Sequence, residues 1–244
     1  MLLAIDIGNT NIDFALFNKK GKIVKRYTKP TGFANAASTI ATIRKRTDIE
    51  KVILASVVPV MQKRIEKMLR NTFRPIRVSL VGKNINVPLK SEYKKREIGQ
   101  DRLITAFAAQ AIYGKPVLIV DFGTAVTLDA ISKKGSYLGG LILPGIKMSL
   151  ETLSERTALL PKTYLKKTNT FIGKNTESSI RNGMIYGYAS LCEGLVKRFK
   201  KKLGKDMKVV ATGGDATLIS KYSPSLRILE PDLALKGLYL LSNV

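Results

Sequence analysis

A buried strand that ends in an aspartate and a glycine-containing turn occurs twice in this chain, and this repeat constrains the fold most. The first copy is Asp6-Ile7-Gly8-Asn9-Thr10-Asn11, after an apolar run that starts at Leu2. The second copy is Asp121-Phe122-Gly123-Thr124-Ala125, after an apolar run that starts at Val117. Glycine permits close approach of the backbone to a ligand, and turn N–H groups bind phosphate oxygens. One copy alone also fits an ordinary hairpin turn, but two copies predict a pair of phosphate-binding turns.

The segments around the two turns follow the same layout. In the first half, strands are expected at 2–7, 12–17, 22–27, 51–56 and 76–81, with helices at 34–46 and 60–71. In the second half, strands are expected at 117–121, 126–131, 136–143, 208–212 and 226–229, with helices at 145–156, 178–202, 215–221 and 232–241. Three strands with short connections predict an antiparallel meander, and the following alternation of helix and strand predicts parallel pairing.

A polar, basic segment at 87–97 is interpreted as a loop, and residues 100–112 as a helix. The break at Gly114-Lys115-Pro116 places the division near residue 113. The chain is therefore expected to form an α/β structure of two similar domains, 1–113 and 114–244.

The composition excludes several kinds of chemistry. The chain has no histidine, so a general base must be Asp, Glu, Lys or Tyr. Its single cysteine, Cys192, cannot form an internal disulfide and fits a reducing compartment. No apolar run reaches the roughly 18 residues of a membrane helix, and no secretory signal is recognisable. We therefore expect a cytoplasmic protein without a membrane partner.

The net charge of +24, from 42 Lys and Arg against 18 Asp and Glu, raises the question of nucleic-acid binding. The basic residues form no single tail, and aromatic residues do not alternate with them. We expect no specific nucleic-acid partner, only non-specific attraction to anionic polymers and surfaces.

A third glycine motif, Ala211-Thr212-Gly213-Gly214-Asp215, ends one strand and precedes a helix. A glycine pair at this place permits close approach of a nucleotide base or sugar, and it also fits a tight strand-to-helix turn. The chain has no Gly-x-x-x-x-Gly-Lys-[Ser/Thr] motif and no Gly-x-Gly-x-x-Gly after a strand, which disfavours P-loop and Rossmann nucleotide binding.

Taken together, these motifs resemble the acetate and sugar kinase, Hsc70 and actin superfamily and, more narrowly, the type III pantothenate kinases. Besides the three motifs above, the resemblance rests on Gly99-Gln100-Asp101-Arg102, Gly139-Gly140 with Pro144-Gly145-Ile146, Thr157-Ala158-Leu159-Leu160-Pro161, and Gly173-Lys174-Asn175-Thr176. The seven segments span nearly the whole chain in the family's order. The resemblance implies two tandem ribonuclease H-like (actin-like ATPase) domains with a cleft between them.

The resemblance also implies an activity, the ATP-dependent phosphorylation of pantothenate to 4′-phosphopantothenate, which opens coenzyme A synthesis. Asp101 would be the general base. Pantothenate would contact Gly99, Gln100, Asp101, Arg102 and Thr176. The ATP phosphates would contact Asp6, Ile7, Gly8, Asn9, Thr10, Asn11, Ile12, Asp13 and Thr124. Mg²⁺ would accompany ATP, with Asp6 as a ligand, and Asp121 would hold a monovalent cation, K⁺ or NH₄⁺.

Two residues in or near the Gly99–Arg102 motif bear on the resemblance. Gln100 stands where the family often has alanine, and Tyr93 is a candidate substrate-facing tyrosine. The residues alone also allow a simpler interpretation of Asp101, because aspartate is favoured at any helix N-terminus.

The resemblance further implies a homodimer. The predicted helix 178–202 has an apolar face to bury: Ile180, Met184, Ile185, Tyr188, Leu191 and Leu195. Burial of that face inside one subunit is the alternative.

Two other functions remain open: a regulatory or nucleic-acid-binding protein on the same scaffold, and a kinase for another small hydroxy acid. Asp6, Asp101 and Asp121 favour an enzyme over a nucleic-acid binder, because their carboxylates would repel a phosphate backbone.

Overall fold

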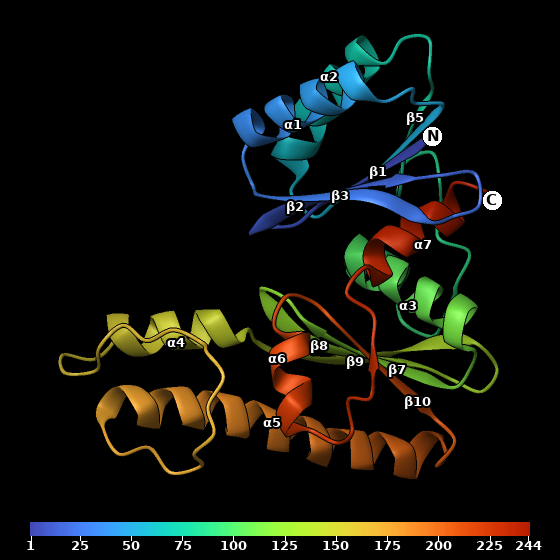
Figure 1. Ribbon diagram of the computed structural model, residues 1–244. Helices are drawn as coiled ribbons and strands as arrows, with labels where there is room; N and C mark the ends of the chain where they lie inside the picture. The colour runs from blue at the N-terminus through green and yellow to red at the C-terminus, as the bar shows by residue number, and fades with distance from the viewer. The chain divides into compact units, whose positions relative to one another are not determined.

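The chain builds two sheets, and five strands of each follow the same order (Figure 1). The structure is a computed structural model that describes residues 1–244, apart from the side chain of Lys95. Its contacts divide the chain into two units. Unit 1 comprises Met1–Leu89, Lys94–Ala108 and Asp232–Val244, and unit 2 comprises Lys90–Tyr93 and Ala109–Pro231.

The sheet of unit 1 has the order β3-β2-β1-β4-β5. Its strands are β1 (Leu2–Ile7), β2 (Asn11–Phe17), β3 (Ile23–Pro30), β4 (Lys51–Ser56) and β5 (Val78–Leu80). β1, β2 and β3 form an antiparallel meander, whereas β4 pairs parallel to β1 and β5 parallel to β4. The predicted meander and the predicted parallel pairing are both confirmed.

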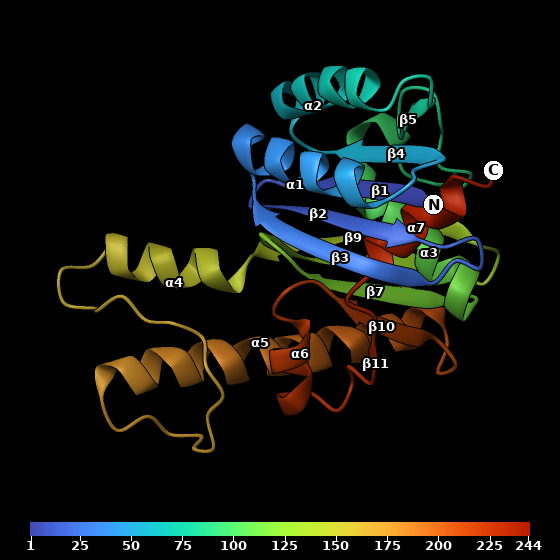
Figure 2. The ribbon, with the colours of Figure 1, turned by 45° about the horizontal axis from the view of Figure 1, so that its top comes forward.

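Alternation along the strands gives this sheet two different faces. Side chains such as Ile5, Ile7 and Phe14 form a buried core with α1 (Phe33–Arg46) and α2 (Pro59–Thr72), which lie together on one face in Figure 2. On the other face, Phe17 stacks on Tyr239 of α7 (Leu233–Leu241) with ring centroids 4.9 Å apart.

The sheet of unit 2 has the order β11-β10-β7-β8-β9-β6. Its strands are β6 (Lys90–Ser91), β7 (Val117–Phe122), β8 (Ala125–Ile131), β9 (Ser136–Pro144), β10 (Lys208–Thr212) and β11 (Ile228–Leu229). β7 to β9 form a second antiparallel meander, and β10 pairs parallel to β7, as β4 does to β1. The predicted structural repeat is therefore confirmed.

Helices of unit 2 cover the core face of its sheet. They are α4 (Ile146–Glu155), α5 (Thr176–Leu203) and the short α6 (Ala216–Ile219), which is followed by a 3₁₀ turn, Ser220–Tyr222. Ile185 of α5 is fully buried, and Met184, Tyr188, Leu191 and Leu195 pack against the same core. Most of the apolar face predicted on this helix is therefore buried inside the subunit.

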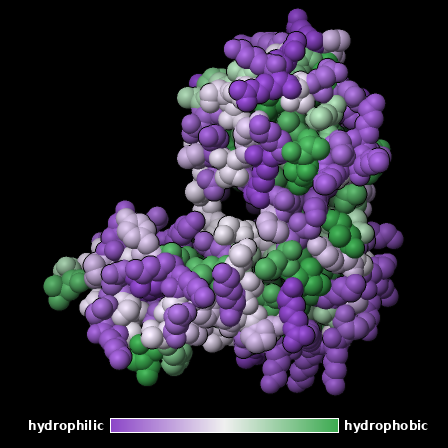
Figure 3. Space-filling model, in the orientation of Figure 1, coloured by the Kyte–Doolittle hydropathy of each residue, from purple (hydrophilic) through white to green (hydrophobic). Residues whose placement is uncertain are grey.

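Other apolar side chains of unit 2 remain exposed near α4 and in the loop before α5. Leu159, Phe171 and Ile172 are 91%, 70% and 74% exposed. Figure 3 shows apolar side chains on the surface at this end of the unit.

Two expectations differ from the structure. The segment 87–97 is not all loop, because β6 pairs with the start of β9 and Lys95–Glu97 forms a 3₁₀ turn. The predicted C-terminal domain, 114–244, extends beyond unit 2, because α7 groups with unit 1. Arg26 Nη1 on β3 lies 2.6 Å from Asp232 Oδ1 at the N-cap of that helix. The helix α3 (Gln100–Tyr113) begins in unit 1 and ends in unit 2.

Candidate active site

The first glycine turn lies between β1 and β2, and hydrogen bonds from Thr31, the residue after β3, hold it in place. The Gly8 N–H donates to the carbonyl of Asn11 at 2.9 Å, which closes the turn. The Thr31 hydroxyl donates to the carbonyl of Gly8 at 2.7 Å, and the Thr31 N–H to the carbonyl of Thr10 at 2.9 Å. Asn9, Thr10 and Asn11 are exposed. The turn is therefore a fixed structure with polar groups that a phosphate can reach.

Three predicted phosphate ligands in this region have limited freedom to act. Ile7 and Ile12 are fully buried, so only their main-chain groups can serve a ligand. The Asp13 carboxylate accepts a hydrogen bond from the Thr28 hydroxyl at 2.5 Å and pairs with Arg26 at 3.1 Å. The Asp13 carboxylate is therefore bound to side chains of β3.

Asp6 points away from the main core of unit 1. Ile5 and Ile7 on either side of it are in the core with α1 and α2, so strand alternation directs Asp6 to the opposite face, the face that α7 covers. It pairs in register with Ala55 on β4, at the carboxyl end of both parallel strands. Ligands of α/β sheets commonly bind outside this edge.

The Gly99-Gln100-Asp101-Arg102 segment forms the N-terminus of α3 near the same edge of the sheet. A Cβ atom added to Gly82, just beyond β5, would lie 3.0 Å from the side-chain amide carbon of Gln100. β5 is two strands from β1, a spacing of about 10 Å. Unit 1 thus gathers the first glycine turn and the Asp101 segment at one edge.

Asp101 is held by its own helix. Its Oδ1 accepts the N–H of Arg102 at 2.8 Å, and a Cβ added to Gly99 would overlap its carboxylate. The contact has the geometry of a helix N-terminal acid, the simpler interpretation from sequence, and it also fixes where the carboxylate lies.

The second glycine turn and the third glycine motif meet in unit 2. Asp121 on β7 is in register with Thr212 on β10. Gly213 has a φ of +90°, and a Cβ there would lie 2.5 Å from Asp121 Oδ1. Only glycine fits this backbone and this approach.

Gly145, the residue before α4, completes the same edge. A Cβ on it would overlap the carbonyl oxygen of Thr124 in the second turn. Glycine motifs from three distant parts of the chain are therefore packed together at the carboxyl ends of β7 and β10. The exposed main-chain groups of such turns suit a polyphosphate.

An ion pair lies beside these glycines. Lys147 Nζ on α4 is 3.6 Å from Asp215 Oδ1. Burial raises the pKa of Asp215 above its ordinary value, and the nearby Lys147 ammonium acts in the opposite direction.

The residues present fit the cations that were predicted. Among the described residues, no group of three or more Asp, Glu, Cys or His forms a metal cage. Mg²⁺ bound with a nucleotide needs only one or two carboxylates together with phosphates. Asp6 and Asp121 each supply one carboxylate at a strand end, and Gly213 leaves open the space beside Asp121 that a Cβ would fill.

The remaining predicted residues lie elsewhere in unit 2. Thr176 is the exposed first residue of α5, directly after its N-cap Asn175. Tyr93 is 44% exposed, and its N–H donates to the Ser91 hydroxyl at 3.1 Å. Sequence reasoning missed Thr31 and Lys147, whose spacing from the motifs carries no signal.

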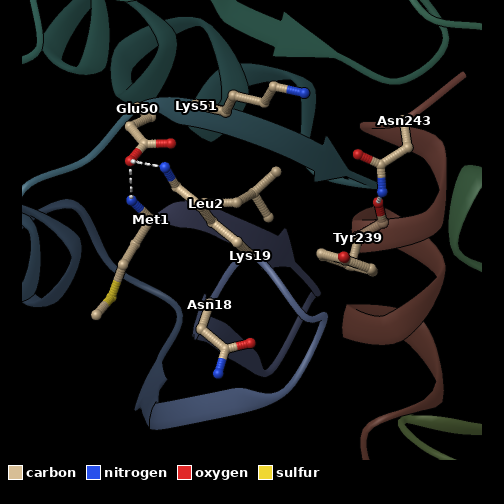
Figure 4. A pocket seen from close by; sticks show the side chains of 8 residues that line it. All are labelled: Met1, Leu2, Asn18, Lys19, Glu50, Lys51, Tyr239 and Asn243. Carbon is tan, nitrogen blue, oxygen red and sulfur yellow. Dashed lines mark hydrogen bonds and ion pairs between the residues drawn. The ribbon is translucent and has the colours of Figure 1, made fainter.

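A cavity of about 190 Å³ lies at the opposite edge of the unit 1 sheet (Figure 4). Glu50 there pairs with the Met1 amino group at 3.4 Å and with Lys19 at 3.8 Å. The cavity adjoins the amino ends of β1 and β4, away from both the first glycine turn and Asp101. It is therefore not the candidate active site.

Comparisons with known proteins identify the family and the fold of the chain. The family model described as type III pantothenate kinase matches residues 2–198. A Baf family protein of Campylobacter jejuni, described as a transcriptional activator, is 22% identical over 99% of this chain and 97% of its own, with a TM-score of 0.55.

Two sugar kinases share the fold at lower identity. An inorganic polyphosphate/ATP-glucomannokinase of an Arthrobacter strain is 15% identical over 99% of this chain and 98% of its own, with a TM-score of 0.53. A ROK family glucokinase of Streptomyces griseus is 11% identical over 100% and 99%, also with a TM-score of 0.53. The predicted two-domain, actin-like kinase fold is confirmed. No helix in the described chain has the length and apolar character needed to span a membrane.

Proposed function

The chain belongs to the type III pantothenate kinase family, and from this premise we propose that it transfers the γ-phosphate of ATP to the hydroxyl group of pantothenate. The product would be 4′-phosphopantothenate, and the reaction the first step of coenzyme A synthesis. Family and fold are those of a phosphotransferase. The observation that carries the finer proposal is the family match, which includes both aspartate–glycine turns and the Asp101 segment.

In this proposal Asp101 accepts the proton of the attacking pantothenate hydroxyl. Phosphoryl transfer passes through a loose transition state and asks little of its base, so a carboxylate held in position is sufficient. The hydrogen bond from the Arg102 N–H fixes this carboxylate at the start of α3. Arg102 would pair with the pantothenate carboxylate. Gly99, Gln100 and Thr176 would line the remainder of that site.

The two glycine turns would bind the ATP phosphates, with Thr124 among the contacts. Asp6 would hold Mg²⁺ and Asp121 a K⁺ or NH₄⁺ ion. When bound, these cations neutralise charge on the phosphates. The hydrogen bond from the Thr31 hydroxyl to the Gly8 carbonyl fixes the first turn. This supports the proposed role, because the N–H donors of a preorganised turn need no rearrangement during the reaction.

We further propose that the enzyme acts in the cytoplasm as a homodimer. The family and the exposed apolar side chains of unit 2 support these proposals.

ADP release from purified protein with Mg-ATP tests the proposed reaction. We expect release to depend on pantothenate, and mass spectrometry to show pantothenate gaining one phosphate. A panel of other small hydroxy acids tests the main alternative: faster turnover of another acid would replace pantothenate as the substrate. Activity should be small in Na⁺ alone and restored by K⁺ or NH₄⁺. Equal activity with all three ions would contradict the assignment of a monovalent-cation site to Asp121.

A further inference from the structure

The Lys147–Asp215 ion pair in unit 2 has no part in the reaction proposed above. Its two side chains are unequally exposed, 70% for Lys147 and 13% for Asp215. An exposed ammonium group therefore pairs with a carboxylate that is nearly buried. Ordinary surface ion pairs have two exposed partners and contribute little to stability.

Asp215 has no structural task that explains its burial. It is the N-cap residue of α6, but its side chain caps no N–H group of that helix. Lys147 is its one side-chain partner among the residues that the structure describes. Burying a carboxylate costs free energy unless the charge is well paired. The arrangement therefore retains a charge at this place at the expense of stability.

Both residues are attached to the second glycine turn. Lys147 lies two residues after Gly145, where an added Cβ would overlap the carbonyl oxygen of Thr124. The Asp215 N–H donates to the carbonyl of Phe122 at 3.4 Å. Main-chain packing thus holds the ion pair beside the turn that the proposed function gives to ATP.

We propose that Lys147 and Asp215 recognise the nucleotide: the Lys147 ammonium binds phosphate oxygens, and the Asp215 carboxylate accepts hydrogen bonds from the ribose hydroxyls. The inference rests on the proposed ATP site and names the class of ligand that the pair selects, a ribonucleoside polyphosphate. Lysine is a mobile point charge suited to phosphate. Asp215 lies between the end of β10 and α6, and a carboxylate on the ribose hydroxyls is a contact that dinucleotide-binding folds also use.

Calorimetric titration without pantothenate tests this pair independently of kinase turnover. Wild type, Lys147→Ala and Asp215→Ala are titrated with Mg-ATP, Mg-2′-deoxy-ATP and adenosine. Lys147→Ala should weaken ATP binding roughly tenfold and leave adenosine binding unchanged, as loss of one charged hydrogen bond predicts. Wild type should prefer ATP to 2′-deoxy-ATP by roughly tenfold, and Asp215→Ala, which has no acceptor for the ribose hydroxyls, should bind the two equally.

Unit 2 offers a matched control pair. Lys133 Nζ lies 3.5 Å from Asp206 Oδ1, and both side chains are exposed. Lys133→Ala and Asp206→Ala make the same changes and should bind all three ligands as wild type does. Thermal melts confirm that each variant folds, and Lys147→Met, which keeps the aliphatic stem, repeats the test if Lys147→Ala melts early.

Two results would overturn the inference, and they are distinguishable. If the variants bind every ligand as wild type does, the pair has no part in recognition and the proposed kinase stands. If wild type does not bind ATP, the ATP site fails together with the inference.

Discussion

At the scale of single residues, Asp101 combines a structural role at the start of α3 with the proposed role of general base. Its Oδ1 accepts the Arg102 N–H, and an asparagine would keep that acceptor. Asp101→Asn should therefore fold normally, yet lack the group that takes the proton. We expect kcat to fall by about 10²-fold or more, with a much smaller change in pantothenate and ATP binding. Steady-state kinetics and calorimetry measure the two effects separately.

The control for this change is Asp48→Asn, which alters an aspartate of unit 1 outside the segment. Turnover within a few-fold of wild type in Asp101→Asn would exclude this residue as the base.

Asp215 permits a prediction about stability and pH. Burial raises its pKa in the folded protein above the ordinary 3.8, so folding favours the protonated form. Its contribution to stability is therefore fully present below about pH 3.8 and is lost as pH rises through the raised folded pKa. Asp215→Asn should melt higher than wild type at pH 7 by roughly 1 to 4 °C, and the difference should shrink as pH falls towards 4.

Thermal denaturation across pH 4 to 8 measures this difference, with Asp206→Asn as the exposed control. A lower melting temperature for Asp215→Asn at pH 7 would show that the Lys147 contact outweighs the cost of burial.

At the scale of elements, the long helix α5 depends on a capping box at its start. The Asn175 side chain accepts the Ser178 N–H at 2.8 Å, and the Asn175 N–H donates to the Ser178 hydroxyl at 3.1 Å. Asn175→Ala removes one of these bonds and should cost about 1 kcal/mol of stability. Asn175→Asp keeps the acceptor and should be close to neutral.

Differential scanning calorimetry of both variants checks this cap. Equal melting temperatures for the alanine and aspartate variants would mean that packing along α5, and not its cap, decides where the helix begins.

At the scale of the whole molecule, the exposed apolar side chains of unit 2 predict a dimer. The buried face of α5 no longer argues for one, because the subunit's own core covers it. The proposal now depends on Phe171 and Ile172, which are 70% and 74% exposed. Exposed apolar clusters of this kind commonly mark interfaces. Light scattering at micromolar concentration should give about twice 26.9 kDa.

A double change, Phe171→Asp with Ile172→Asp, should give the monomer mass. Val60, which is equally exposed in unit 1, provides the control: Val60→Asp should remain dimeric. A wild-type monomer with full activity would contradict the proposal.

Most helices and strands, and their repeated order, could be predicted from the sequence alone. Runs such as 2–7, 51–56 and 208–212 form strands with the expected bounds, because alternation and glycine turns act over a few neighbouring residues. The glycine motifs were recognisable for the same reason. The roles of the individual site residues remain predictions.

The contacts between distant segments could not be predicted from the sequence and are seen only in the folded chain. These include the pairing of the two-residue β6 with β9, the Thr31 hydroxyl on the Gly8 carbonyl, the Lys147–Asp215 pair and the grouping of α7 with unit 1. Each of these contacts joins residues that are far apart in the chain, so no periodic pattern or motif in the sequence indicates it. Such contacts form because the sheets bring strand ends to common edges, and that arrangement exists only once the chain has folded.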